Sequence, residues 1–266
     1  MWRFVVTLGC AAALRGSAAP RRRVQPAASA AVDVEDVRAC LDREYRSFFD
    51  PLEAAFYLPD VSFDDPLSSL AGLEAYRKNI DMLAGRNALG RVLFSDASIN
   101  LHSCEVLGPV RLRTRWMLQM TFNALPWKPT ARFTGVSEYD LDATTLKIKA
   151  QTDYWDSIDL ADGAYKRSSV TAGARDFAAQ LAIGKADWGP SQELLRRSRD
   201  YSVFLRNGRV VAMARTKPGD ASATANLRAS LARDGLAGGE KALSSADDLV
   251  ALDLATPHPW EAYALA

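Results

Sequence analysis

Histidine and cysteine are scarce in this sequence, which has two histidines and three cysteines among 266 residues. Cys10 lies in the N-terminal leader, and neither Cys40 nor Cys104 belongs to a Cys-x-x-Cys motif or to a Cys/His cluster. This usage excludes a structural zinc site of the usual kind and a disulfide framework. We therefore expect no protein-bound metal ion and two buried free thiols.

Long apolar runs and an excess of one charge are also missing. The longest apolar run of the leader, Phe4 to Leu14, is shorter than the roughly 20 residues that cross a bilayer. We expect no integral membrane segment in the mature chain. The net charge is +1, and subtracting the five arginines of residues 1–32 leaves the rest at −4. Such a body gives no electrostatic reason to expect nucleic acid as a partner.

Residues 1–32 have the composition of a targeting leader. Arg3 precedes the apolar run, small residues follow at 16–19, and the stretch beyond them carries Arg, Ala and Ser but no acid. The first part has the order of a signal peptide and the second the composition of an organelle transit peptide. We expect import into a plastid (chloroplast) through the secretory route. Secretion and import into another organelle are the alternatives.

The next part of the chain, residues 36–160, predicts one α+β domain. Apolar residues at steps of three and four predict two helices, the first capped by Asp33 and stopped by Pro51. Period-two alternation predicts four strands, over residues 92–107, 110–122, 131–141 and 146–155. Short turns between them indicate antiparallel pairing. We expect a curled antiparallel sheet with helices on one face and a pocket on the concave side.

A smaller unit follows. Residues 161–190 are rich in Ala and Gly, and we interpret them as a linker with one short helix. Residues 191–266 then predict a small βαβ-type unit, with a hairpin at Asn207-Gly208, an amphipathic helix and a third strand. So small a unit needs a partner surface. We expect it to pack on the first domain or on a second copy of itself.

Four segments resemble a known superfamily when read in order: "FYLPDVSFDDPLSSLAGLEAYRKN", "RTRWMLQM", "LPWKPTARFTGVSEYDL" and "TDYWD". Together they resemble the uncharacterised plant and cyanobacterial branch of the SnoaL-like, nuclear-transport-factor-2-like superfamily, over residues 36–160. The resemblance implies a cone-shaped α+β domain that encloses a pocket. It does not imply one chemistry, because the superfamily includes isomerases, cyclases, dehydratases and binding or scaffolding modules.

The end of the chain is similar to part of a SOUL-type haem-binding domain. The similarity lies in "PSQELLRRSRDYSVFLRNGRVVAMAR" and "LRASLARDGL", which amount to about one of the two halves of such a domain. It makes haem a candidate cofactor and a tetrapyrrole the first ligand to test. His258, between two prolines in the tail, is the candidate axial ligand, and an exposed tail histidine is the alternative interpretation.

Carboxylates are the expected acid–base groups of the first domain, because histidine is so scarce. A carboxyl group in a dry pocket has a raised pKa, which makes it a usable base or acid near neutral pH. The candidates are Asp64, Asp65, Glu138, Asp153 and Asp156.

Each candidate also has a structural interpretation. Asp64 and Asp65 precede Pro66 and would end a strand and cap a loop. Arg113 and Arg115 would form cross-strand ion pairs with Glu138. His102, on a strand without a second ligand at metal spacing, is interpreted as a structural histidine.

Aromatic residues form a predicted pocket wall. Trp116, Tyr139, Tyr154 and Trp155 are its members, with Arg115 as the polar neighbour. Aromatic walls bind flat apolar molecules, and the alternative is that these rings form the core. Leu112 and Leu118 share a face with Trp116, which favours burial of that ring.

Three functions are compatible with the sequence. The first is a non-catalytic protein that binds a small apolar ligand or a protein partner. The second is a small isomerase or cyclase with Asp64 or Asp65 as base and Arg115 or Tyr139 stabilising the developing charge. The third is a homodimeric scaffold.

Overall fold

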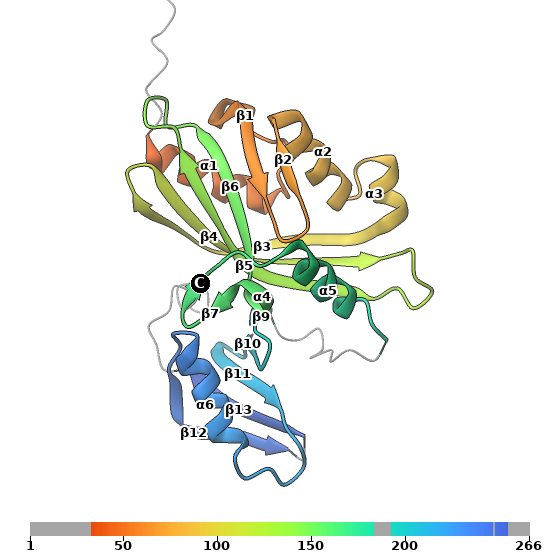
Figure 1. The fold of residues 1–266 in the computed structure, drawn as a ribbon, viewed down its shortest axis with the longest axis vertical. Helices are drawn as coiled ribbons and strands as arrows, with labels where there is room; N and C mark the ends of the chain where they lie inside the picture. The colour runs from red at the N-terminus through yellow and green to blue at the C-terminus, as the bar shows by residue number, and fades with distance from the viewer. Residues whose placement is uncertain (1–32, 184–192, 247, 255–266) are drawn as a thin grey trace, which may run out of the picture. The chain divides into compact units, whose positions relative to one another are not determined.

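The computed structural model describes residues 33–183, 193–246 and 248–254 (Figure 1). The predicted leader, the end of the predicted linker and the tail with His258 lie outside these residues. Within the described part, no helix is both long enough and apolar enough to cross a membrane.

The predicted helices at the start of the domain are confirmed. Helix α1, Val34–Arg46, begins where the Asp33 side chain accepts a hydrogen bond from the Asp36 N–H (2.8 Å), which satisfies a free backbone donor of the first turn. Helix α2, Leu73–Leu83, follows the predicted periodicity. A short 3-10 helix, η1 (Ala54–Phe56), and the short helix α3, Ala88–Leu93, were not predicted.

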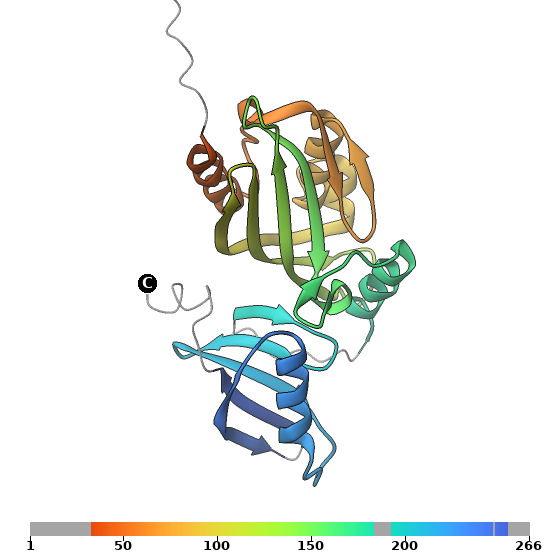
Figure 2. The same cartoon turned by 60° about the vertical axis from the view of Figure 1, so that its left-hand side comes forward.

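A six-stranded sheet follows these helices. It has the order β2-β1-β6-β5-β4-β3, with one parallel pair, β1 with β6, and antiparallel pairs elsewhere. The strands are β1 (Tyr57–Asp64), β2 (Ser69–Ala71), β3 (Phe94–Gly108), β4 (Arg111–Phe122), β5 (Thr130–Leu141) and β6 (Ile148–Trp155). All four predicted strands are therefore confirmed, and the fold class is α+β with a curled, unclosed sheet (Figure 2).

The two faces of the sheet carry different side chains, as the alternation in β4 predicted. Leu112 and Trp116 point to the concave face and join the main core with residues of α1 and α2. Met117 points to the other face, where it packs with Leu194 and Phe204. The concave face is thus the one that the first two helices cover.

The segment after β6 differs from the linker that the sequence predicted. It forms α4 (Asp156–Asp159), β7 (Leu160–Ala161), β8 (Ala164–Tyr165) and α5 (Val170–Gln180). Phe177 of α5 stacks on Phe133 at 6.0 Å between ring centroids. A Cβ on Gly173 would lie 2.1 Å from the Pro66 carbonyl oxygen, so glycine permits the close approach of α5. Small residues here serve packing rather than flexibility.

The C-terminal unit is a five-stranded sheet with the order β12-β13-β11-β10-β9 and one helix, α6 (Ala223–Arg233). Its strands are β9 (Glu193–Arg197), β10 (Ser202–Arg206), β11 (Arg209–Arg215), β12 (Gly238–Ala246) and β13 (Leu249–Leu254). The predicted hairpin is confirmed, with positive φ at Asn207 and Gly208. All strand pairs are antiparallel, which corrects the predicted βαβ-type connection. Strands β9 and β12 escaped prediction because "ELLRR" and "GGEKALSSA" lack alternating β-branched residues.

Candidate functional site

A small cavity of about 60 Å³ lies between the concave face of the sheet and the first two helices. Its walls come from the end of α1, from β1, α2, β3, β4 and β6. The lining residues are Tyr45, Phe48, Phe49, Phe63, Tyr76, Asn79, Ile80, Leu83, Ile99, Trp116, Leu118, Gln151 and Asp153. Most of this wall is apolar or aromatic, and its polar part includes Gln151 and Asp153 of β6 and Asn79 of α2.

Secondary-structure periodicity explains how these side chains meet. Tyr76, Ile80 and Leu83 lie on one face of α2, and Gln151 and Asp153 lie two positions apart on β6. A Cβ on Gly135 would lie 3.1 Å from the Trp116 ring and 2.0 Å from the Tyr154 carbonyl oxygen. The absence of a side chain at Gly135 therefore makes room for the Trp116 indole.

A buried polar cluster holds two residues of the cavity wall, Tyr45 and Trp116, in position. The Tyr45 hydroxyl lies within hydrogen-bond distance of Thr114 Oγ1 (2.8 Å), Ser137 Oγ (3.2 Å) and the Tyr139 hydroxyl (3.0 Å). The Trp116 indole N–H donates to Ser137 Oγ at 2.8 Å. These bonds satisfy polar groups that would otherwise be costly to bury, and they fix the orientation of the Trp116 ring.

Asp153 is the acidic group of the cavity. Gln151 Nε2 donates to Asp153 Oδ1 at 2.8 Å, and the Tyr76 hydroxyl donates to Gln151 Oε1 at 2.7 Å. Burial raises the pKa of the Asp153 carboxyl to about 7, although hydrogen bonds from Ser137 and Gln151 oppose the rise. Asp153 can therefore gain or release a proton near neutral pH inside an apolar site.

A second buried carboxyl, Glu44 on α1, lies outside the cavity wall. It accepts hydrogen bonds from the Tyr57 hydroxyl (2.5 Å) and from the Glu53 N–H (2.6 Å). Burial raises the pKa of Glu44 to about 7. Because both of its oxygens accept bonds from the protein, Glu44 is a structural group that ties α1 to η1 and β1.

The predicted bases Asp64 and Asp65 lie away from the cavity wall. Asp64 accepts hydrogen bonds from Ser69 Oγ and from Arg167, whose guanidinium lies 2.9 Å away. Asp65 accepts bonds from the Leu67 N–H (2.7 Å) and the Ser68 N–H (2.6 Å). Their geometry is that of a strand end and a turn cap, as the structural interpretation stated.

Glu138 and Arg115 lie on the opposite face of the sheet from the cavity. Glu138 pairs with both Arg111 and Arg113. The predicted pair between Arg115 and Glu138 is wrong, because the strand register places Arg113 opposite Glu138 and Arg115 two positions further along. That position brings Arg115 to Asp156, the residue that follows β6.

Arg115 forms a buried cluster with Asp156. Its guanidinium donates to both oxygens of Asp156 (2.7 and 3.2 Å), to the Tyr165 hydroxyl (3.1 Å) and to the Leu195 carbonyl oxygen (2.6 Å). Burial alone would raise the pKa of Asp156, but the Arg115 guanidinium holds it below its usual value. The cluster joins β4, α4, β8 and β9, which is a structural role.

The predicted aromatic wall divides between three places. Trp116 lines the cavity, whereas Tyr139 lies outside the cavity wall, in the polar cluster with Tyr45. Trp155 belongs to the core, with its ring centroid 4.5 Å from that of Phe133. Tyr154 points to the opposite face, where its ring contacts Tyr165.

Sequence analysis missed most of the cavity wall. Phe48, Phe49, Phe63 and Tyr76 come from three segments that no local pattern connects. The helical spacing of Tyr76 with Ile80 was the one available signal, and it indicated burial rather than a cavity.

His102 lies on strand β3. Its side chain is buried, with Nδ1 3.5 Å from Glu193 Oε1, and burial lowers its pKa to about 4. Among residues 33–183, 193–246 and 248–254, no group of three His, Cys, Asp or Glu side chains could hold a metal ion.

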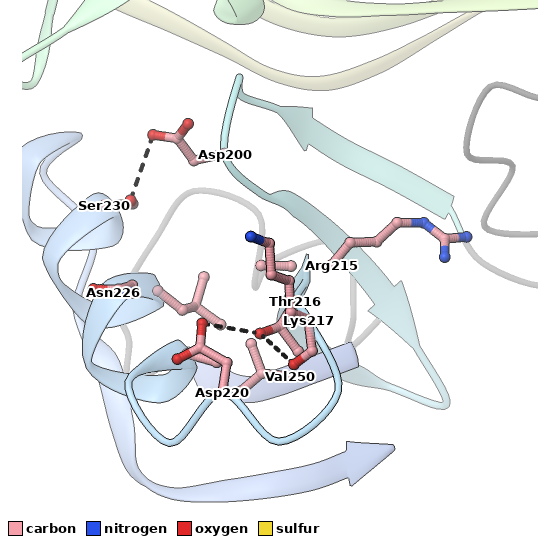
Figure 3. A pocket seen from close by; sticks show the side chains of 11 residues that line it. Asp200, Arg215, Thr216, Lys217, Asp220, Asn226, Ser230 and Val250 are labelled. Carbon is pink, nitrogen blue, oxygen red and sulfur yellow. Dashed lines mark hydrogen bonds between the residues drawn. The ribbon is translucent and has the colours of Figure 1, made fainter. Parts of the chain in front are cut away.

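A second hollow, of about 490 Å³, lies in the C-terminal unit between α6 and the loop after β11 (Figure 3). Its polar side chains bond mainly to one another or to neighbours. Asp220 accepts a bond from Thr216, Asp200 accepts one from Ser230, and Arg215 pairs with Asp248. Its lining residues are mostly polar or charged, whereas small-molecule sites are lined mainly by apolar and aromatic side chains.

Comparison with known proteins gives one matching family model and several similar solved structures. Residues 35–150 match the family model described as an uncharacterized conserved protein, DUF2358. No curated protein matches this chain.

Similar solved structures include three bacterial proteins. A putative SnoaL-like polyketide cyclase from Mesorhizobium loti is 16% identical, with 46% of this chain and 99% of that chain covered and a TM-score of 0.36. A putative SnoaL-like polyketide cyclase from Jannaschia sp. CCS1 is 10% identical, with 50% and 91% covered and a TM-score of 0.36. An NTF2-like protein of unknown function from Exiguobacterium sp. 255-15 is 16% identical, with 44% and 98% covered and a TM-score of 0.35.

Proposed function

We propose that the cavity binds a small, largely apolar molecule, with Asp153 and Gln151 as its polar contacts. The observation that supports this most is an aromatic cavity with one carboxyl group and few amide groups in its wall, two of these residues on β6 and Asn79 on α2. Ligand pockets have this composition, with apolar walls and a few placed polar groups. This proposal corresponds to the first function considered from the sequence, a protein that binds a small apolar ligand.

The size of the cavity limits the ligand. Pockets for drug-sized molecules occupy roughly 300–1,000 Å³, whereas this cavity measures about 60 Å³. A tetrapyrrole, which the sequence made the first ligand to test, needs far more room. The ligand we propose has only a few non-hydrogen atoms.

The backbone just after α1 has an unusual conformation at two phenylalanines of the cavity wall. Phe48 and Phe49 both have positive φ (53° and 58°), which is uncommon for bulky residues and costs roughly 1–2 kcal/mol each. Arg86 donates to the Phe48 carbonyl oxygen at 3.1 Å, and Asp81 holds Arg86 at 2.7 Å. This strained turn keeps two aromatic rings at the cavity, which is how strain is often used at binding sites.

A substitution that fills the cavity tests the proposal. Leu83→Phe adds a ring at the wall and is expected to abolish binding of small neutral probes such as benzene and tert-butanol. Leu89→Phe is the matched control, because Leu89 is 56% exposed on α3 and outside the cavity wall. Binding would be followed by NMR through the Trp116 indole N–H signal of the full chain. Equal binding by both variants, or none by the unmodified protein, would contradict the proposal.

A second candidate function is proton abstraction by Asp153. The pKa of about 7 suits a general base at neutral pH, and Asp153 lines the cavity where a substrate would lie. The test is the rate of α-proton exchange of 2-butanone in D₂O. We expect acceleration by the unmodified protein and none by Asp153→Asn. An equal rate with both proteins would exclude this role.

The remaining predictions from the sequence stay predictions. They are a protein partner, a homodimeric scaffold, haem binding through His258, and plastid import. Light scattering that gave a monomer at all concentrations would count against the scaffold.

A further inference from the structure

We propose that the molecule bound in the cavity is a small organic cation, an ammonium group that carries short alkyl substituents. The inference rests on the proposed binding function and specifies the chemical class of its ligand. It follows from the signs of the partial and full charges that face the cavity.

Aromatic side chains make up a large part of the cavity wall, and the face of an aromatic ring carries partial negative charge. Six of the lining side chains are aromatic, namely Tyr45, Phe48, Phe49, Phe63, Tyr76 and Trp116. They form a connected group, with centroid distances of 4.9 Å between Tyr45 and Phe49 and 5.4 Å between Phe63 and Tyr76. A cation near such rings is attracted by roughly 0.5–2 kcal/mol per favourable contact.

The Asp153 carboxyl group, when ionised, also favours a cation in the cavity. Of the described residues that line the cavity, Asp153 is the one whose charge changes near neutral pH, and none is Lys, Arg or His. The nearest polar neighbours, Gln151 and Ser137, are neutral. A buried carboxylate is costly without a cationic partner. A bound ammonium group would supply that partner.

The number of oxygen ligands excludes a metal ion as the preferred cation. Hard cations such as Ca²⁺ require about six to eight oxygen ligands. Here the wall offers one carboxylate, Asp153, and two side-chain amides, Asn79 and Gln151, and Gln151 Oε1 already accepts the Tyr76 hydroxyl. An alkylated ammonium needs less solvation, because its alkyl groups contact the apolar wall formed by Ile80, Leu83 and Leu118.

Two probes of the same shape test this inference, tert-butylammonium and the neutral tert-butanol. NMR titrations of the full chain at about pH 8.5, where Asp153 is ionised, give both affinities from the Trp116 indole and Gln151 amide signals. We expect the ammonium to bind at least about tenfold more tightly than the alcohol. In Asp153→Asn this preference is expected to fall to the part that the aromatic rings supply, and in Leu83→Phe neither probe is expected to bind.

The remaining outcomes show whether the cation inference alone fails or whether the proposed binding function fails with it. Equal affinities for the two probes would overturn the cation inference and leave the proposed binding function standing. A preference for the ammonium that is undiminished in both variants would place its binding elsewhere and overturn the inference. No response to either probe would overturn the inference and the proposed function together.

Discussion

Replacing Asp156 by alanine is expected to lower the free energy of unfolding by about 3–5 kcal/mol. The Arg115 and Asp156 side chains are only 6% and 0% exposed, and their closest atoms lie 2.7 Å apart. Loss of the carboxylate would leave the Arg115 guanidinium buried without its anionic partner Asp156, although it would still donate to a carbonyl oxygen and a phenol. Removing one member of a buried ion pair costs this much because the other charge stays in a low dielectric.

An exposed ion pair in the same chain provides the control. Arg215 and Asp248 are also 2.7 Å apart, but their side chains are 52% and 58% exposed. Asp248→Ala is therefore expected to change the free energy of unfolding by less than about 1 kcal/mol. Urea denaturation monitored by tryptophan fluorescence would measure both variants. If Asp156→Ala cost no more than Asp248→Ala, the Arg115 cluster would not be the structural junction described above.

Replacing Asp153 by asparagine is expected to stabilise the free protein at pH 8 by about 1–3 kcal/mol. Burial raises the pKa of Asp153 to about 7, from a usual value near 4. A full shift of this size corresponds to about 4 kcal/mol at 1.36 kcal/mol per unit, and the partial solvent contact of Asp153 reduces it. Asparagine keeps an oxygen for the Gln151 amide and carries no charge.

The pH dependence fixes the sign of this effect. With a raised pKa, the folded protein holds the Asp153 proton more tightly than the unfolded chain does. The contribution of the protonated Asp153 to the free energy of unfolding is fully present below about pH 4, falls as the pH rises, and is lost above about pH 7. The advantage of Asp153→Asn should therefore be large at pH 8 and small at pH 4.

The groups around Asp153 support this sign. The phenols of Tyr45 on α1, Tyr76 on α2 and Tyr139 on β5 face this part of the core, and burial raises the pKa of each. Asp65, at the end of β1, adds a like charge. Glu44 also titrates near pH 7, but it is present in both proteins and cancels in the comparison. Equal stabilities of the two proteins at pH 8 would show that Asp153 is not desolvated.

Local sequence patterns predicted the elements but not the site. The apolar spacing in α1 and α2 and the alternation in four strands each depend on neighbours in the chain, and the structure confirms them. The cavity instead depends on tertiary contacts between Phe63, Tyr76 and Trp116, which lie in different elements. The partner of Arg115 depended on strand register, which alternation alone does not determine. Asp153 was a candidate by residue type, and only the fold distinguished it from Asp64 and Asp65.

The most direct test of the account is an NMR titration of the Asp153 carboxyl carbon between about pH 3 and 9. We predict a midpoint near 7 in the free protein and a lower midpoint when tert-butylammonium saturates the cavity. A midpoint near 4 in the free protein would contradict the account, because Asp153 would then be solvated like an ordinary surface carboxylate.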